Sequence, residues 1–262
     1  MWSICLPSDE GNTLTQVIAH RGASLDFPEN TLSAFQAACI PGVSAIEFDV
    51  QLSRDGVPVV FHDETMERIG LGRERCAELD SSALRKLDVG GWFDPVFSDQ
   101  RIPLLDEIVE AITDREIWIE IKVYRRDWES GRTRHLANSI VERLDKSGAG
   151  NRTRILSFHR PTLEYFYQIA PQIRRVWNVK RPIFLDAITN APPVGLDALD
   201  VSIKRVTPEF SVAVRRLGLS LMAYTCNTDE HVERAIAMNV DGLITDRPDW
   251  AFDKLRSAES EL

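Results

Sequence analysis

The 262-residue sequence predicts an α/β protein: a (β/α)8 barrel with a small insertion after its second strand. Two observations predict this fold. Short apolar runs alternate with amphipathic helical segments along the chain, which is typical of parallel strands joined by helical crossovers. Nine runs have strand character, but only three residues separate the second from the third, too few for a parallel crossover.

The strand candidates, in order, are QVIAHRG, SAIEFDVQLS, VPVVFHD, EIWIEIKV, RILSFH, RRVWNV, ALDVSI, LSLMAYTCN and GLITD. Helical segments between them are predicted at residues 30–40, 105–113, 133–146, 161–169, 208–217 and 229–238. In LLDEIVEAI, for example, apolar residues recur every three to four positions, which places one stripe against a sheet.

The third run is the exception to the parallel pattern. Arg54, Asp55 and Gly56 alone link it to the second run, and Asp-Gly is a strong hairpin signal. We therefore expect an antiparallel flap folded back over the barrel mouth. Eight parallel strands remain, which is the number that the barrel needs.

The stretch 64–103 fits no barrel unit. It is too long for an ordinary loop, and segments of that kind usually have a function. It contains Trp92, Phe93 and several leucines, so disorder is a poor interpretation, and a short helix is expected around 82–86. We expect a small cap beside the mouth, within one domain that spans residues 1–262.

Composition excludes several classes of function. The net charge is −9 and the pI is about 5.2, which argues against a nucleic-acid or anionic-membrane partner. An anionic substrate is not excluded, because a bound metal can invert the sign of a pocket. The four cysteines are scattered, the N-terminus does not resemble a secretory signal, and no apolar run approaches ~20 residues. We expect a cytoplasmic protein with free thiols and no stable membrane insertion; the oligomeric state is not indicated.

Three carboxylates lie where strands end. Glu47 and Asp49 are two positions apart in IEFDV and so point the same way, and Glu120 lies in WIEIK. Active groups of parallel barrels gather at the C-terminal ends of the strands. Three carboxylates at one mouth cannot all stay ionised without a compensating cation. Hard oxygen ligands favour Mg²⁺ or Ca²⁺ over zinc, so one divalent cation is predicted.

Histidines and basic side chains end the same runs. His20 and Arg21 end VIAHRG, Lys122 ends WIEIK, and His62 ends the flap. The basic side chains and a metal would neutralise phosphate oxygens, and an imidazole titrates near neutrality, which suits proton transfer. The pattern indicates a phosphoryl-transfer site.

Each group also has a purely structural interpretation. Taken alone, Asp49 would cap a turn, Lys122 would pair with Glu120, and Arg21 would be a surface residue. The same coincidence at three separate strands, with His62 on the flap, favours a catalytic site.

The motifs resemble those of the glycerophosphodiester phosphodiesterase family. They are AHRGASLDFPENTLSAF, IEFDVQLSRDGVPVVFHDETMERI, LRKLDVGGWF, RIPLLDEIV, IEIK and DGLITDRP. The resemblance runs from about residue 18 to 248 and is densest over the first 123 residues. It implies a TIM barrel with a small insertion after the second strand, in agreement with the strand count.

The resemblance also implies a reaction: hydrolysis of a glycerophosphodiester to sn-glycerol 3-phosphate and an alcohol such as choline or ethanolamine. In related barrels the neighbouring glycerol hydroxyl can attack first, which gives a cyclic phosphate. The implied roles are proton acceptor for His20, proton donor for His62, cation ligands for Glu47, Asp49 and Glu120, and phosphate contacts for Arg21 and Lys122. Glu29 and Asn30 are expected to cap the first helix and brace the site.

Two features depart from the family pattern. Tyr224 stands where the family usually has tryptophan in a W-T-x-N run, and we expect it to contact substrate. Lys180 and Arg181, just past a strand end, would suit a more anionic or sugar-bearing substrate, although two basic residues after a strand are more often solvated. His159 also ends a strand, but a lone histidine there is more commonly structural.

Two alternatives therefore stay open beside a small, water-soluble glycerophosphodiester. The same chemistry would act on a lysophospholipid or a sugar phosphodiester, although the acidic net charge disfavours a lipid surface. A non-catalytic barrel that binds a phosphodiester or a partner protein ranks lower, because both histidines and all three carboxylates are present.

Overall fold

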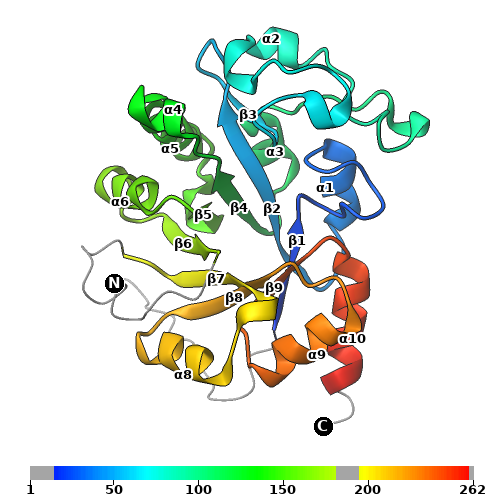
Figure 1. Cartoon of the computed structure of the whole chain (residues 1–262), viewed down its shortest axis with the longest axis vertical. Coiled ribbons are helices and arrows are strands. Elements are labelled where there is room, and N and C mark those ends of the chain that lie inside the picture. The colour runs from blue at the N-terminus through cyan, green and yellow to red at the C-terminus, as the bar shows by residue number, and fades with distance from the viewer. Residues whose placement is uncertain (1–14, 181–194, 260–262) are drawn as a thin grey trace.

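The computed structural model describes residues 15–180 and 195–259 of the chain (Figure 1). Cys5 and Arg181 lie outside these ranges. The remaining cysteines, Cys39, Cys76 and Cys226, are free thiols, as expected. Within the described part of the chain, no helix is both long enough and apolar enough to cross a membrane.

Eight parallel strands form a closed barrel, so the predicted fold is confirmed (Figure 1). They pair in the order β1-β9-β8-β7-β6-β5-β4-β2, and β1 pairs with β2 to close the ring. Their bounds are β1 (Gln16–His20), β2 (Val43–Leu52), β4 (Glu116–Ile121), β5 (Thr153–Ser157), β6 (Arg174–Val179), β7 (Ala198–Ser202), β8 (Ser220–Tyr224) and β9 (Gly242–Thr245).

The predicted flap is also present. Strand β3 (Pro58–Val60) pairs antiparallel with β2, with Val60 opposite Val50. Gly56 has φ of 81° in the connecting turn, a conformation in which glycine carries no steric cost. The hairpin carries His62 back toward the mouth.

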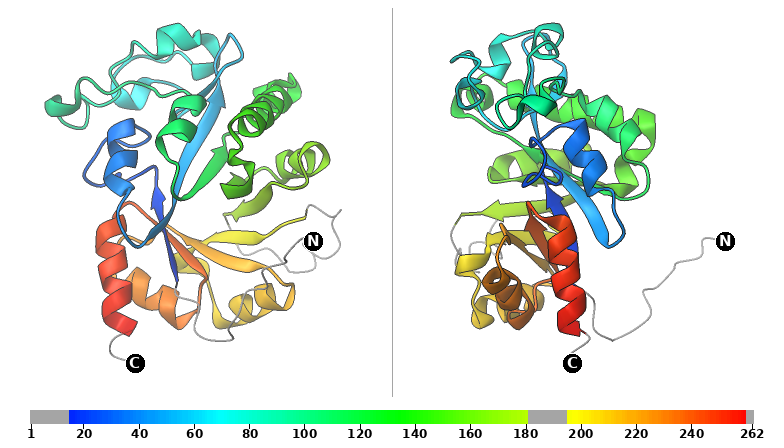
Figure 2. Two further views of the ribbon diagram at one scale, coloured as in Figure 1. Left: turned by 180° about the vertical axis from the view of Figure 1, so that it is seen from behind. Right: turned by 90° about the vertical axis from the view of Figure 1, so that its right-hand side faces the viewer.

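Helices surround the barrel on its outside (Figures 1 and 2). They are α1 (Leu32–Ala38), α3 (Leu105–Ala111), α4 (Arg125–Glu129), α5 (Arg132–Ser147), α6 (Arg160–Ile169), α8 (Pro208–Arg216), α9 (Asp229–Ala237) and α10 (Pro248–Glu259). Threonine side chains cap three of them: Thr31, Thr207 and Thr228 each accept a backbone N–H from the first turn. All six predicted helices are present; α4 and α10 were not predicted.

The barrel interior is layered. The lower layer is apolar and buried, and consists of Ile18, Ala45, Trp118, Leu156, Val176, Ala198, Met222 and Ile244. Inward-facing side chains recur every second residue, so the next layer toward the C-terminal ends is two positions further along each strand. That layer is mostly polar: His20, Glu47, Glu120, Phe158, Asn178, Asp200, Tyr224 and Asp246. The strands therefore place a polar mouth on an apolar floor.

The insertion between β3 and α3 has a core of its own. It contains α2 (Ser81–Leu84) and three short 3-10 turns, at Glu67–Ile69, Cys76–Glu78 and Pro95–Phe97. Its apolar cluster consists of Val59, Phe61, Met66, Ile69, Cys76, Leu84, Val89 and Ile102. The segment lies beside β3 and α1, at the top of Figure 1.

Candidate active site

Strand register brings the predicted residues to one level of the barrel. His20 on β1 pairs with Glu47 on β2, and Asp49 pairs with Glu120 on β4. One pocket is lined by His20, Glu47, His62 and Glu120, together with Arg21, Lys122 and Tyr224. The convergence expected from the strand-end pattern is therefore observed.

The three carboxylates form a compact buried cluster. One oxygen from each of Glu47, Asp49 and Glu120 lies within 4.8 Å of the others, and the residues are 2%, 0% and 8% exposed. Among the described residues, Glu47 Oε1 accepts no hydrogen bond. Burial, with the negative charges of Asp49 and Glu120, raises the pKa of Glu47 well above its usual range. Such a cluster of hard oxygen donors with free lone pairs fits a metal ion.

Two cations border the carboxylates. Arg21 Nε lies 3.0 Å from Asp49 Oδ2, and Lys122 Nζ lies 2.8 Å from Asp49 Oδ1 and 2.5 Å from Glu120 Oε1. Burial opposes ionisation of Asp49, but the charges of Lys122 and Arg21 outweigh it and lower the pKa of this carboxyl. The simple Lys122–Glu120 pair considered from the sequence is thus part of a larger ionic network.

His20 is held by Asp246. The two lie 2.5 Å apart, from His20 Nδ1 to Asp246 Oδ1, and Asn227 Nδ2 donates to the other oxygen of Asp246 at 2.5 Å. Ser24 Oγ donates to His20 O and to Asp246 Oδ1. Because the carboxylate occupies Nδ1, the ring's Nε2 is left for the pocket.

His62 has a similar partner. Its Nδ1 lies 2.6 Å from Asp63 Oδ1, and Arg68 Nε donates to Asp63 Oδ2 at 2.5 Å. Arg68 also pairs with Glu29, which bonds Arg21 at 3.0 Å, so one polar network joins the flap to the first loop. Burial lowers the pKa of His62, against the opposing charge of nearby Asp49.

The expectation that Asn30 caps the first helix is wrong. Thr31 is the N-cap, and its side chain accepts from the Ala34 amide. Asn30 has φ of 59°, donates from Nδ2 to Asp49 Oδ2 at 2.8 Å, and accepts the Asp49 N–H at Oδ1. The asparagine braces the carboxylate directly, so the bracing part of the expectation holds and the capping part does not.

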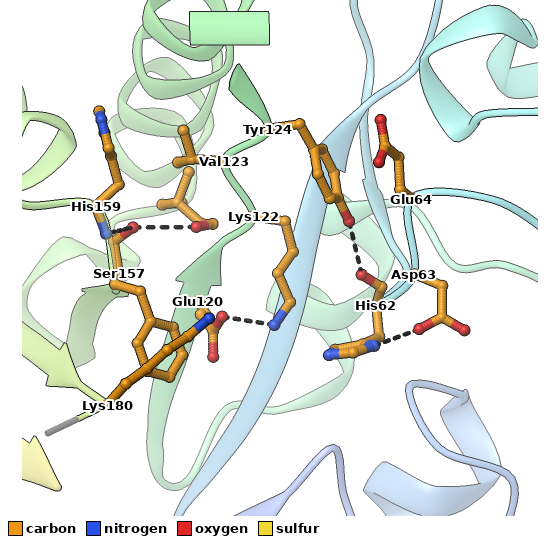
Figure 3. Close-up of a pocket in the computed structure, with 12 residues that line it drawn as sticks. His62, Asp63, Glu64, Glu120, Lys122, Val123, Tyr124, Ser157, His159 and Lys180 are labelled. Atoms are coloured by element: carbon orange, nitrogen blue, oxygen red, sulfur yellow. Dashed lines mark hydrogen bonds and ion pairs between the residues drawn. The ribbon is translucent and has the colours of Figure 1, made fainter. Parts of the chain in front are cut away.

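The pocket has an inner and an outer part. The inner pocket, which contains both histidines, has a volume of about 270 Å³ and is also lined by Phe158, Asn178, Asp200 and Tyr224. The outer groove, of about 660 Å³, contains His62 but not His20 (Figure 3). Its lining is His62, Asp63, Glu64, Glu120, Ile121, Lys122, Val123, Tyr124, Ser157, Phe158, His159 and Lys180.

Three further candidates from the sequence also line these spaces. Tyr224 faces the inner pocket, with its hydroxyl donating to Val179 O at 3.0 Å. Lys180 Nζ lies over the Phe158 ring, 5.4 Å from its centroid. His159 lines the outer groove, but its Nδ1 bonds Thr162 Oγ1 at 2.9 Å, which supports the structural interpretation.

This geometry agrees with comparisons to known proteins. A model of the glycerophosphoryl diester phosphodiesterase family matches residues 20–250. The chain belongs to this family. A glycerophosphodiester phosphodiesterase from Caldanaerobacter subterraneus subsp. tengcongensis is 31% identical over 92% of this chain and 98% of that protein.

Solved structures of two phosphodiesterases are similar to this fold. An Oleispira antarctica phosphodiesterase in complex with the product sn-glycerol-3-phosphate has a TM-score of 0.83 and 26% identity, over 94% of this chain and 97% of that one. A glycerophosphodiester phosphodiesterase from Agrobacterium tumefaciens has a TM-score of 0.74 and 27% identity, over 91% of this chain and 99% of that one.

Four polar residues in this family member were not singled out from the sequence. Asp63 and Asp246 directly contact the two histidines, and Asn178 and Asp200 line the inner pocket. The strand-end pattern that found Glu47 would also have found Asp246, which follows GLIT directly. Asn178 and Asp200 each lie inside a strand between two hydrophobic neighbours, which is a weaker signal.

Proposed function

We propose that the protein hydrolyses glycerophosphodiesters to sn-glycerol 3-phosphate and an alcohol. Its two active-site histidines would act as general acid and base beside one divalent cation, Mg²⁺ or Ca²⁺. The observation that carries this proposal is geometric: His20 and His62, each oriented by an aspartate, border the buried carboxylate cluster. The names of the relatives and the glycerol phosphate product in the Oleispira structure support the substrate class.

The histidines would divide proton transfer between them. Asp246 at Nδ1 of His20 leaves Nε2 of that ring to accept a proton from the attacking hydroxyl or water. Asp63 stabilises the protonated ring of His62, which would donate a proton to the departing alkoxide. Because His62 lines the outer groove and His20 does not, the alcohol would leave through the outer groove.

Arg21 and Lys122 would contact the phosphate. Both line the inner pocket beside the carboxylates, so either can turn toward an incoming phosphate oxygen. Glu47, Asp49 and Glu120 would hold the cation, which when bound would stabilise negative charge on the phosphate. Arg21 and Lys122 would add positive charge that is already in place before the reaction.

The lining of the outer groove favours a small polar alcohol. Nine of its twelve residues are charged or carry hydrogen-bonding side chains; the apolar ones are Ile121, Val123 and Phe158. An acyl chain would remove water from those polar side chains without offering them hydrogen bonds, so a lysophospholipid fits less well.

The test is turnover by metal-stripped protein. Glycerophosphocholine is offered with Mg²⁺, Ca²⁺ or EDTA, and released sn-glycerol 3-phosphate is quantified. We expect metal-dependent release that falls roughly 10²- to 10⁴-fold in His20→Ala and in His62→Ala. His135→Ala, at an exposed position on α5, is the matched control and should retain activity. Full turnover in EDTA, or in either active-site variant, would refute the mechanism.

Cation binding has a readout independent of turnover. A cation that binds only the folded protein stabilises it by about 2.7 kcal/mol at a concentration of 100 times the dissociation constant. We therefore expect Mg²⁺ or Ca²⁺ to raise the melting temperature of the metal-stripped protein. Asp49→Asn, which removes a charge from the centre of the cluster, should abolish that rise.

A further inference from the structure

Within residues 15–180 and 195–259, two buried acceptors of the inner pocket have no hydrogen-bond partner. Asn178 on β6 and Asp200 on β7 are opposite each other in the strand register, and they are 3% and 2% exposed. Among the described residues, neither Asn178 Oδ1 nor Asp200 Oδ1 receives a hydrogen bond. Buried polar atoms are nearly always satisfied, so this pair requires an explanation.

The predicted cation does not explain why these two acceptors are unpaired. The carboxylates that approach within 4.8 Å of one another are those of Glu47, Asp49 and Glu120, and Asp200 is outside this group. Asn178 Nδ2 donates to Glu120 Oε2 at 3.3 Å. Because that carboxylate needs a donor, the amide nitrogen faces Glu120 and the amide oxygen is turned away from it.

The neighbouring Tyr224 side chain does not satisfy the pair either. The Tyr224 hydroxyl, on the strand beyond Asp200, donates to the backbone at Val179 O instead. The Tyr224 ring packs edge to face on Phe158, with centroids 5.9 Å apart, and both rings line the inner pocket. The pocket thus presents two acceptors beside two aromatic rings.

The size of the inner pocket indicates a ligand larger than one water. Its volume of about 270 Å³ far exceeds the roughly 10–15 Å³ that a cavity needs to hold one water molecule. A suitable ligand offers two hydrogen-bond donors on one side and C–H groups to the rings. A short polyol has these properties, whereas an alkyl group lacks the donors.

We propose that Asn178 Oδ1 and Asp200 Oδ1 bind the hydroxyl groups of the glycerol moiety, and so select a polyol phosphodiester over an alkyl one. This inference rests on the proposed function and assigns the glycerol side of the same site. The phosphate lies between the cation ligands and His62, the glycerol lies in the inner pocket, and the alcohol lies in the outer groove. An alkyl group in the inner pocket would leave both acceptors unpaired. A site discriminates more strongly against a ligand that leaves its buried polar groups unpaired than against one that differs by a single methylene.

Equilibrium binding tests the assignment without depending on turnover. Dissociation constants of sn-glycerol 3-phosphate and n-propyl phosphate are measured by calorimetry on cation-loaded protein. The two ligands share the phosphate and the three-carbon chain and differ in the hydroxyl groups. We expect the wild-type protein to prefer the glycerol ligand by about tenfold or more.

Substitutions at Asp200 then identify the acceptor. Asp200→Leu should reduce the preference to about twofold, chiefly by weakening the glycerol ligand, and Asp200→Asn, which keeps an acceptor, should retain more of it. Asp99→Asn, at an exposed position in the insertion, is the control. Melting temperatures with and without cation show whether each variant folds. If Asp200→Leu does not fold, the test is decided by Asp200→Asn.

Three results would overturn the inference. The first is a wild-type protein that binds sn-glycerol 3-phosphate no more tightly than n-propyl phosphate. The second is an Asp200→Leu variant that keeps the wild-type preference, and the third is a folded Asp200 variant that binds both ligands more weakly by the same factor. The proposed function fails by a different result, absence of phosphodiester turnover. Turnover without a hydroxyl preference would refute only the role of Asn178 and Asp200, and a preference without turnover would refute only the reaction.

Discussion

The Asp246 carboxylate lies 2.5 Å from His20 Nδ1, although 226 positions separate the two residues in the sequence. Parallel pairing of β1 with β9 brings them together, because Ala19 is opposite Thr245 and the next residue of each strand faces the mouth. Asn227 and Ser24 bond the same carboxylate, which fixes its orientation. Asp246 therefore sets which nitrogen of His20 faces the pocket.

Asp246→Asn should lower kcat roughly 10²- to 10⁴-fold with little change in KM. An amide in place of the carboxylate offers Nδ1 a donor as readily as an acceptor, so the ring can adopt the wrong tautomer. The upper end of the range is the effect of the same kind of substitution in the serine-protease triad, about 10⁴-fold. Steady-state kinetics across pH measure the change in kcat. Burial opposes ionisation of Asp246, but its contact with His20 lowers the pKa of the carboxyl. Asp249→Asn, an exposed neighbour in α10, is the control. Equal kcat in the wild-type protein and Asp246→Asn would show that the contact has no role in orienting His20.

The barrel was predictable from the sequence because it depends on local patterns. Apolar runs and helical periodicity repeat along the chain, and the Asp55-Gly56 turn alone identifies the antiparallel strand. The cation cluster was predictable for a similar reason: residues two apart on a strand share a face, so Glu47 and Asp49 could be placed together.

The partners of the site residues were less predictable because they depend on long-range geometry. Asn30 and Thr31 are adjacent and both are good N-cap residues, and only the backbone shows that Thr31 caps while Asn30 turns to Asp49. Whether Asp200 is paired depends on side chains from three other strands. The composition of β7, the strand that carries Asp200, contains none of that information.

Arg75 should be important for the stability of the insertion. Its side chain is 12% exposed and lies 2.8 Å from Asp127 and 2.7 Å from Glu64, with its guanidinium over the Tyr124 ring. Arg75→Ala should lower the free energy of unfolding by about 3 kcal/mol, since it leaves the largely buried Asp127 without one of its cations. Urea unfolding measures this change.

Arg73 provides the matched control for that prediction. It belongs to the same segment and pairs with Glu67 at 2.9 Å, but its side chain is 85% exposed. Arg73→Ala should change the free energy of unfolding by about 0.5 kcal/mol or less. Similar losses in the two variants would mean that burial does not decide the contribution of these ion pairs.

Gly22 should not tolerate alanine. It has φ of +85°, and an added Cβ would lie 2.6 Å from the backbone carbon and oxygen of Ala34. Gly148 has φ of +68° with no atom within 4 Å of an added Cβ, so it isolates the backbone cost. We expect a loss of about 1 kcal/mol for Gly148→Ala and about 3 kcal/mol for Gly22→Ala, from strain plus overlap. Thermal unfolding of both variants gives the comparison, and equal losses would show that α1 shifts to make room.

Replacing Asp200 should change the free energy of unfolding by an amount that depends on pH. Burial and the negative charge of Glu120 raise the pKa of Asp200 well above its usual range. Between the unfolded pKa of about 3.9 and the higher folded pKa, the native state keeps a proton that the unfolded chain has released. The native state then binds more protons than the unfolded state, so wild-type stability falls as the pH rises through this window.

Asp200→Leu removes that titration. In EDTA, its free energy of unfolding should therefore rise relative to that of the wild-type protein as the pH increases from about 4 toward the raised pKa of Asp200. The increase should be about 1.4 kcal/mol for each pH unit that lies between the two pKa values. Urea unfolding at a series of pH values measures the difference, with Asp99→Leu as the exposed control. A difference that stayed constant with pH would mean that the Asp200 carboxyl ionises as freely in the barrel as in water, and the unpaired oxygen in the inner pocket would then have to be solvated.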